Sequence, residues 1–269
     1  MAFCWSCVGV WMAVGSVIAY FFFLKKKKQV ELLKREWKSD TVYLYQFPRP
    51  KMLPNMSPYC LKVETFLKAN NITYEVCPLL MGRSKYGLLP FIELNGEHIA
   101  DSQIILHRLK KHFKLDLGKT QINIWFKFRV LFKFKIIESP GSSYVMTMVP
   151  SLGMPQALTP IIAPLASCMI KRAVSARIAS NIGKFPIEDF KDFLRKDLDT
   201  YRDLLGDKKF FFGDEISSAD CTLFSQLATT IYIPVESYAK DVICDEYPEL
   251  VTFCDNVRDK VFGKEFAQE

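Results

Sequence analysis

The chain has 269 residues, of which 49% are hydrophobic and 14% aromatic, and this composition excludes a disordered protein. The length allows one or two domains. The net charge of +7 is unevenly distributed, because residues 24–38 hold seven Lys or Arg against two Glu, a net of +5, which leaves +2 for the rest. This distribution argues against nucleic acid as a partner and indicates a basic cluster beside a membrane.

Residues 2–24 contain no charged side chain, and as a helix they would be about 34 Å long, enough to cross a bilayer. A secretory signal peptide is the alternative, but no Lys or Arg precedes the apolar run and no small-x-small cleavage site stands before Lys25. We therefore predict a single-pass transmembrane anchor at 1–24 and a basic linker at 25–39. The lysines after the anchor place the globular part in the cytosol by the positive-inside rule. The organelle stays open between endomembranes, including the lysosome, and the mitochondrial outer membrane.

The next part of the chain predicts a small α/β layer, built as β-α-β and then β-β-α. An apolar run at 41–47 indicates a buried strand, and Ser57 and Pro58 suit the N-cap and the first position of a helix that ends at Asn70-Asn71. The elements that follow are a strand at 72–76 parallel to the first, a loop at 81–89, strands at 91–94 and 97–100 joined by Asn95-Gly96, and a helix capped by Asp101-Ser102.

Ser57 is the candidate catalytic residue. Its hydroxyl stands where a strand is followed by a helix N-terminus, and the backbone N–H groups and the helix dipole at such a point favour an anion such as a thiolate. The alternative is that Ser57 caps the helix and does nothing else, since serine is common at this position.

This order of elements resembles the N-terminal, thioredoxin-like domain of a glutathione transferase, with Leu89-Pro90-Phe91 before the third strand and Asp101-Ser102 before the last helix. The resemblance implies a cis peptide bond at Pro90 and a backbone contact from Leu89 to the cysteinyl part of glutathione. It also implies that Asp101 and Ser102 receive the γ-glutamyl end, whose carboxylate would meet unpaired helix N–H groups at an N-cap Ser102.

The stretch 57–60, Ser-Pro-Tyr-Cys, resembles the Cys-Pro-Tyr-Cys of glutaredoxins, with Ser57 in the nucleophile position. Without a cysteine at 57 the dithiol–disulfide cycle of those proteins is not available. We therefore expect Cys60 to be a buried apolar residue and not a resolving thiol. In the functional interpretation, Ser57 hydrogen-bonds the sulfur of bound glutathione.

Two stretches, 57–67 and 89–102, are similar to the failed-axon-connections family, which includes cadmium-responsive members and is related to metaxins. This resemblance implies a membrane-anchored protein that uses glutathione as co-substrate with a small electrophile, in detoxification or metal stress. The alternative is a non-catalytic interaction module, as in metaxins. A homodimer or protein partners follow from analogy alone.

The remainder of the chain is predicted to be helical, which gives a thioredoxin-like domain at 40–116 and an all-α domain at 117–269. An apolar stripe at 187–205 predicts a helix that ends at Gly206. Ser217-Asp220 resembles the capping motif of transferase C-terminal domains, and the almost uncharged run 221–233 after it indicates a buried helix. Pro248 opens a last helix.

Two segments of this helical part allow alternatives. Residues 139–170 carry no charge, but five prolines argue against a second membrane span and favour core helices joined by a proline-rich loop, with a surface resting on the bilayer as the alternative. Residues 125–135 mix aromatic and basic side chains, which favours a domain helix over a nucleic-acid-binding surface. The eight cysteines are scattered, and Cys4-x-x-Cys7 has no second pair, so no metal site is predicted.

Overall fold

The computed structural model describes residues 32–79, 84–115, 146–147, 159–182 and 185–268. The chain divides into two compact units, Met1–Leu33 and Lys34–Glu269, and the description below concerns the second. The predicted anchor at 1–24 and the segment 125–135 lie outside the described residues. Within the described ranges, no helix is both long enough and apolar enough to cross a bilayer.

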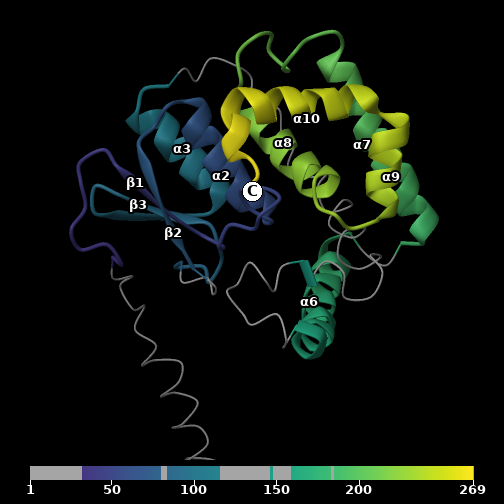
Figure 1. The fold of residues 1–269 in the computed structure, drawn as a ribbon, viewed down its shortest axis with the longest axis horizontal. Coiled ribbons are helices and arrows are strands. Elements are labelled where there is room, and N and C mark those ends of the chain that lie inside the picture. The colour runs from purple at the N-terminus through teal and green to yellow at the C-terminus, as the bar shows by residue number, and fades with distance from the viewer. Residues whose placement is uncertain (1–31, 80–83, 116–145, 148–158, 183–184, 269) are drawn as a thin grey trace, which may run out of the picture. The chain divides into compact units, whose positions relative to one another are not determined.

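The predicted β-α-β-β-α layer is confirmed (Figure 1). Its sheet has the strand order β2-β1-β3-β4, in which β1 and β2 are parallel and the other neighbours antiparallel. The strands are β1 (Val42–Gln46), β2 (Tyr74–Pro78), β3 (Phe91–Leu94) and β4 (Glu97–Ala100), and the helices are α2 (Pro58–Ala69) and α3 (Ser102–His112).

Strand β1 is buried on both faces, which is why its sequence shows no polar–apolar alternation. Val42 and Leu44 join one apolar cluster with side chains of α2 and α3. Tyr43 and Tyr45 point to the opposite face, where the Tyr45 ring stacks on Phe91 with 4.5 Å between ring centroids. The sheet thus lies between two apolar layers, and α2 and α3 share one of them.

The turn chemistry that ends these elements also agrees with the sequence. Asn71, just after α2, has φ of 52°, and Asn95 and Gly96 have φ of 48° and 77° in the β3–β4 turn. Asn and Gly reach this left-handed region at lower cost than other residues. The turn fixes the register in which Leu94 pairs with Glu97.

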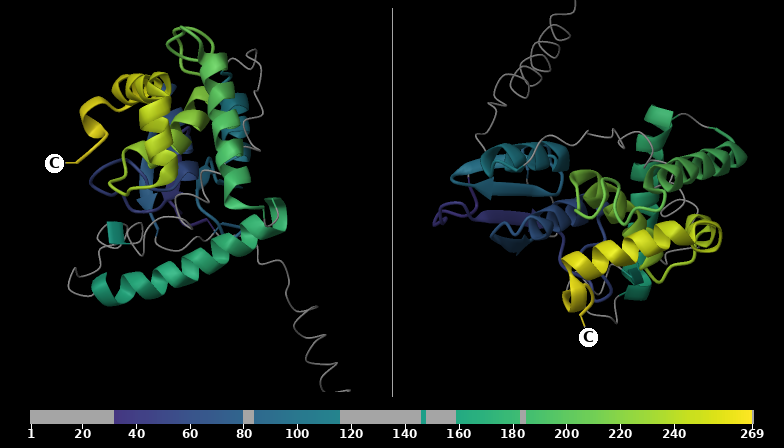
Figure 2. Two further views of the ribbon diagram at one scale, coloured as in Figure 1. Left: turned by 90° about the vertical axis from the view of Figure 1, so that its right-hand side faces the viewer. Right: turned by 90° about the horizontal axis from the view of Figure 1, so that it is seen from above.

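The part after residue 159 is helical, and α7, α8, α9 and α10 gather in one bundle (Figures 1 and 2). The helices are α6 (Thr159–Ile182), α7 (Ile187–Leu205), α8 (Ser218–Ile231), α9 (Tyr238–Glu246) and α10 (Pro248–Val261), followed by a 3-10 turn at Gly263–Glu265. The predicted stripe at 187–205 coincides with α7, and Gly206 ends it with φ of 52°.

Helix α6 shows that the prolines of the stretch 139–170 do not all interrupt a helix. Pro160 and Pro164 both lie inside it, near its N-terminus. A proline in the first turn loses no hydrogen bond, and Pro164 removes one bond in the second turn, so neither prevents a helix here. The helix begins at Thr159 and therefore covers only the end of the uncharged stretch 139–170.

The core of the helical part reaches into the α/β layer. Leu53, Met56 and Leu61, which come from the loop before α2 and from α2 itself, belong to the same buried cluster as the bundle helices. Helix α2 packs on α8 as well as on α3. The segment that carries Ser57 is thus held between the two parts.

Candidate functional site

The predicted site residues converge at one end of the sheet because of its register. Phe91 pairs with Tyr45 on β1 and with Ala100 on β4. Pro90 and Asp101 each lie one residue beyond this row of paired residues, so they are neighbours across antiparallel strands. The β1 end that leads towards Ser57 lies at the same edge. The Leu89-Pro90 peptide bond is cis, as predicted.

Asn55 sets the backbone at Ser57, and the sequence prediction did not identify it. Asn55 is fully buried, its side-chain amide donates to the Phe47 carbonyl at 2.9 Å, and its Oδ1 accepts the Ser57 N–H at 2.9 Å. An Asn that binds the backbone two residues onward forms an Asx turn. The Pro54-Asn55 pair just before the helix was the signal that could have found it.

The loop before Ser57 is also held by the end of the chain. The Arg49 guanidinium donates to the Glu265 carbonyl and, at 3.3 Å, to the Glu64 carboxylate. The Gln268 N–H donates to the Lys51 carbonyl at 2.7 Å. Because backbone and side chains both fix this loop, the position of Ser57 is well defined before any ligand binds.

Ser57 occupies the N-cap position of α2, with φ of −83° and ψ of 119°, but its side chain makes no capping hydrogen bond within the described structure. Its hydroxyl instead hydrogen-bonds the thiol of Cys60, one turn along the helix. Cys60 is fully buried, as expected, and burial raises the pKa of its thiol to about 12, against smaller lowering effects of the Ser57 and Phe47 hydrogen bonds. Cys60 is therefore a neutral thiol at physiological pH.

The start of α3 corrects one detail of the prediction. The N-cap is Asp101 and not Ser102, since the Asp101 carboxylate accepts the N–H of Gln103 at 2.9 Å and of Ile104 at 3.3 Å. Ser102 is the first helical residue and is buried. Asp is as good an N-cap as Ser, and its charge also suits the positive end of the helix dipole. A ligand carboxylate would therefore find these two N–H groups occupied.

Asp101 has a backbone conformation that is unusual for its residue type, with φ of 78° and ψ of 124°. A non-glycine residue at such a positive φ costs on the order of 1–3 kcal/mol, and such residues cluster at functional sites. This conformation turns the chain from β4 into α3 within one residue and keeps the carboxylate over the helix start.

A buried lysine, Lys62, lies beneath the same helix start, and the sequence prediction missed it. It is 4% exposed, and its Nζ donates to the Gln103 side-chain oxygen at 3.2 Å. Burial lowers the pKa of Lys62 to about 8, while the charges of Asp101 and Cys221 act in the opposite direction. Its only signal in the sequence was a lysine among the apolar positions of a helix otherwise expected to face the core.

Large apolar side chains are exposed next to the predicted residues. Tyr59 is 40% exposed two positions after Ser57, and Leu88 and Ile104, next to the other two predicted pairs, are also exposed. Exposed apolar side chains beside polar ones suit a ligand that is not purely polar.

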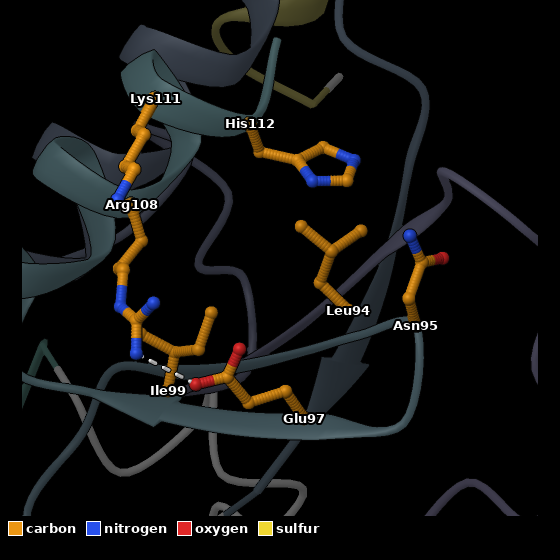
Figure 3. Close-up of a pocket in the computed structure, with 7 residues that line it drawn as sticks. All are labelled: Leu94, Asn95, Glu97, Ile99, Arg108, Lys111 and His112. Carbon is orange, nitrogen blue, oxygen red and sulfur yellow. Dashed lines mark hydrogen bonds and ion pairs between the residues drawn. The ribbon is translucent and has the colours of Figure 1, made fainter.

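A pocket of about 420 Å³ lies elsewhere, between the β3–β4 hairpin and the C-terminal half of α3 (Figure 3). Arg108 in this pocket forms an ion pair with Glu97 at 2.8 Å, and His112 contacts Asp40 at 2.7 Å. Basic residues at a helix C-terminus complement the dipole. Because Ser102 and His112 are the two ends of α3, this pocket is separate from the predicted site.

Metal-ligand geometry is not seen in the described ranges, where no three His, Cys, Asp or Glu side chains could hold an ion. The free cysteines there are dispersed, and Cys60, Cys221 and Cys254 are buried singly.

Comparisons with known proteins place this geometry in a family. Residues 58–136 match the model of the glutathione S-transferase N-terminal domain, and residues 194–257 match that of the glutathione S-transferase C-terminal domain, together more than half of the chain. Failed axon connections of Drosophila melanogaster is 33% identical over 252 residues, which cover 85% of this chain. The chain spans 60% of the length of that relative.

Two further proteins are similar to this chain. The isoprene-epoxide–glutathione S-transferase of Rhodococcus sp. strain AD45 is 27% identical over 222 residues, 77% of this chain and 93% of that protein. The crystal structure of glutathione transferase F7 from Populus trichocarpa has 21% identity and a TM-score of 0.46, over 83% of this chain and 96% of that chain. The chain belongs to the glutathione-transferase-like proteins of the failed axon connections family.

Proposed function

We propose that this protein binds glutathione at the edge of the sheet where Ser57, Leu89-Pro90 and Asp101-Ser102 meet, and that Ser57 activates the bound sulfur. The observation that carries the proposal is that Ser57 stands at a helix N-cap but does not use its hydroxyl as a cap. A hydroxyl that only had to start the helix would bond the helix N–H groups. The family models and the 27% identical glutathione transferase support the choice of ligand.

The chemistry of Ser57 fits this role. A hydroxyl has one donor and two acceptor positions. The Ser57 hydrogen bond lowers the pKa of the Cys60 thiol, so the Ser57 O–H is directed to the Cys60 sulfur. Binding of glutathione would turn this O–H to the ligand sulfur. A hydrogen bond and a nearby helix N-terminus both favour the thiolate form, and the thiolate is the nucleophile.

The reaction that follows is attack on a small electrophile. The thiolate sulfur donates an electron pair to an electrophilic carbon, a C–S bond forms, and the bond to the leaving atom breaks with its electron pair. For an epoxide, the leaving atom is the ring oxygen, which then takes a proton from water. The exposed apolar side chains Tyr59, Leu88 and Ile104 border the place where such a molecule would approach.

Calorimetric titration of the full chain with glutathione tests the proposal. Replacing the cysteinyl residue of the ligand by 2-aminobutyrate removes only the thiol and gives a matched control ligand. We expect glutathione to bind more tightly than this control in the wild type, and the two to bind equally in Ser57→Ala. Absence of saturable glutathione binding would support a non-catalytic interaction module instead.

Membrane attachment through residues 2–24 forms part of the same proposal, with the globular part in the cytosol. It is supported by the uncharged apolar run and by the lysines that follow it. Carbonate-washed membranes should retain the protein, and protease added to intact organelles should digest the globular part. Recovery of the protein in the wash would contradict the membrane attachment. Protection of the globular part from protease would contradict the orientation.

A role in metal stress would follow from glutathione chemistry and not from storage of ions by the protein itself. The dispersed cysteines in the described ranges support this. Titration of the reduced protein with cadmium should find at most about two tight sites, since soft ions need clustered thiolate ligands. Several tightly bound ions per chain would contradict it.

A further inference from the structure

The start of α3 presents an electrostatic difficulty for an anionic ligand. The Asp101 carboxylate already accepts two of the first N–H groups of the helix, and its negative charge repels a second carboxylate. The site described above nevertheless places the carboxylate of a γ-glutamyl group next to Ser102. Such an arrangement needs a compensating positive charge close to the first turn of α3.

Lys62 supplies that charge. Its side chain comes from α2 and passes between α2 and α3, and its Nζ donates to the Gln103 side chain at 3.2 Å. Among the buried residues that the structure describes, it is the single Lys or Arg. The other basic side chains of α3 are directed elsewhere, as Lys110 Nζ donates to Ser218 Oγ at 2.6 Å and Arg108 pairs with Glu97.

We propose that Lys62 is a positioning residue for the carboxylate of an α-amino-acid group. Through Gln103 and through its own charge it holds the first turn of α3, so that Ser102 receives the carboxylate while Asp101 receives the ammonium. The inference rests on the proposed function and deepens it, because it adds Lys62 as a residue that positions the γ-glutamyl end of the ligand.

The environment of Lys62 agrees with a functional role. The charged and titratable groups around it are the Asp101 carboxylate and the Cys221 thiol, and burial outweighs both and lowers the pKa of Lys62 to about 8. A methionine of similar volume would avoid the burial of a charge. The lysine instead places a positive charge next to the first turn of α3, where Gln103 accepts from it.

The test is a double-mutant cycle in which one change is made in the protein and the other in the ligand. Binding is measured by calorimetry on the full chain. The ligands are S-methylglutathione, whose sulfur does not titrate, and the same molecule without the α-carboxylate of its γ-glutamyl residue. The variants are Lys62→Met, Lys62→Arg and, as a matched control, Lys110→Met, which changes a lysine of α3 that bonds Ser218 of α8. We expect Lys62→Met to weaken binding of S-methylglutathione roughly tenfold and binding of the decarboxylated ligand much less. Lys62→Arg should restore most of the loss, and Lys110→Met should bind both ligands like the wild type.

If Lys62→Met loses the same affinity for both ligands, Lys62 only supports the fold. If Lys62→Met binds S-methylglutathione as tightly as the wild type does, the inference is also overturned. Should Lys62→Met not fold, the wild type alone provides the measurement. Its preference for the carboxylated ligand should fall between pH 7 and pH 9.5, as Lys62 loses its proton, and a constant preference contradicts the inference. Glutathione binding that is present but indifferent to Lys62 leaves the proposed function intact, whereas absent binding in the wild type contradicts both.

Discussion

The starts of α2 and α8 both have a serine at the N-cap, but the two serines make different contacts. At α8, Ser217 and Asp220 form a complete capping box, in which Ser217 Oγ accepts the N–H of Asp220 at 3.3 Å and the Asp220 carboxylate accepts the N–H of Ser217 at 2.8 Å. At α2, the Ser57 side chain caps nothing and bonds the Cys60 thiol. The same residue type therefore caps the helix at α8 and makes no cap at α2.

The difference follows from what surrounds each serine. Asp220 is fully buried and also accepts the Phe211 N–H at 2.8 Å, so it joins the helix start to the preceding turn. Ser57 is preceded by Asn55, whose side-chain oxygen accepts the Ser57 N–H, the same contact that Asp220 makes with the N–H of Ser217. The two helix starts thus share the contact to the N–H of the N-cap serine and differ in what the serine hydroxyl bonds. This contrast and the buried Lys62 of α2 are tested by three predictions, given in order of their effect on stability.

The largest expected effect is that of Asp220→Ala. The substitution leaves the N–H groups of Phe211 and Ser217 without their acceptor in a buried place, at a cost of about 3–5 kcal/mol in the free energy of unfolding. Urea unfolding measures this loss, and Asp220→Asn, which keeps an acceptor oxygen, should lose less. Glutathione affinity of the folded fraction should not change, and a specific loss of affinity would show that α8 also shapes the site.

The second prediction concerns Lys62→Met, which should raise stability at pH 7. The pKa of Lys62 is lowered from 10.5 to about 8, mainly by burial, so the folded protein holds this proton less tightly than the unfolded chain. The buried charge of Lys62 lowers the free energy of unfolding by about 3 kcal/mol below pH 8, and this loss disappears as the pH rises from 8 to 10.5. After loss of the Gln103 hydrogen bond, a net gain of about 1–3 kcal/mol remains.

Urea unfolding of both proteins at pH 7 and pH 9.5 checks this prediction. The advantage of Lys62→Met should shrink at the higher pH, because the wild type has by then lost the buried charge. A variant that is less stable than the wild type at pH 7 would mean that Lys62 is retained for the fold and not for a ligand.

The α/β layer could be predicted from the sequence because each of its boundaries has a local signal. Asn95-Gly96 indicates the hairpin, Asn70-Asn71 the end of α2, and the apolar run at 41–47 the central strand. The same holds for α7, whose apolar stripe and terminal glycine are local as well. In each case the pattern and the turn residue lie within a few positions of each other.

The details of the site could not be predicted, because they depend on contacts between distant segments. Asp101 and not Ser102 is the N-cap, and it has a backbone φ of 78°, a conformation that is uncommon for a residue other than glycine. The burial of Lys62 depends on how α2 packs against α3 and α8. The role of Asn55 depends on the Phe47 carbonyl eight residues earlier.

The smallest effect on stability, and the most direct test of the comparison, is that of Ser57→Ala. Because the side chain forms no cap, its loss should change the free energy of unfolding by less than about 0.5 kcal/mol. A hydrogen bond to a charged group is worth roughly 1.5–3 kcal/mol. The pKa of the bound glutathione thiol should therefore rise by about one to two units, and activity at neutral pH should fall about ten- to a hundredfold.

Ultraviolet thiolate absorbance of the complex against pH measures the shift. Ser217→Ala is the matched control, and it should lose about 1–2 kcal/mol of stability with an unchanged thiol pKa. Equal titration midpoints in the wild type and Ser57→Ala would reduce Ser57 to part of the scaffold.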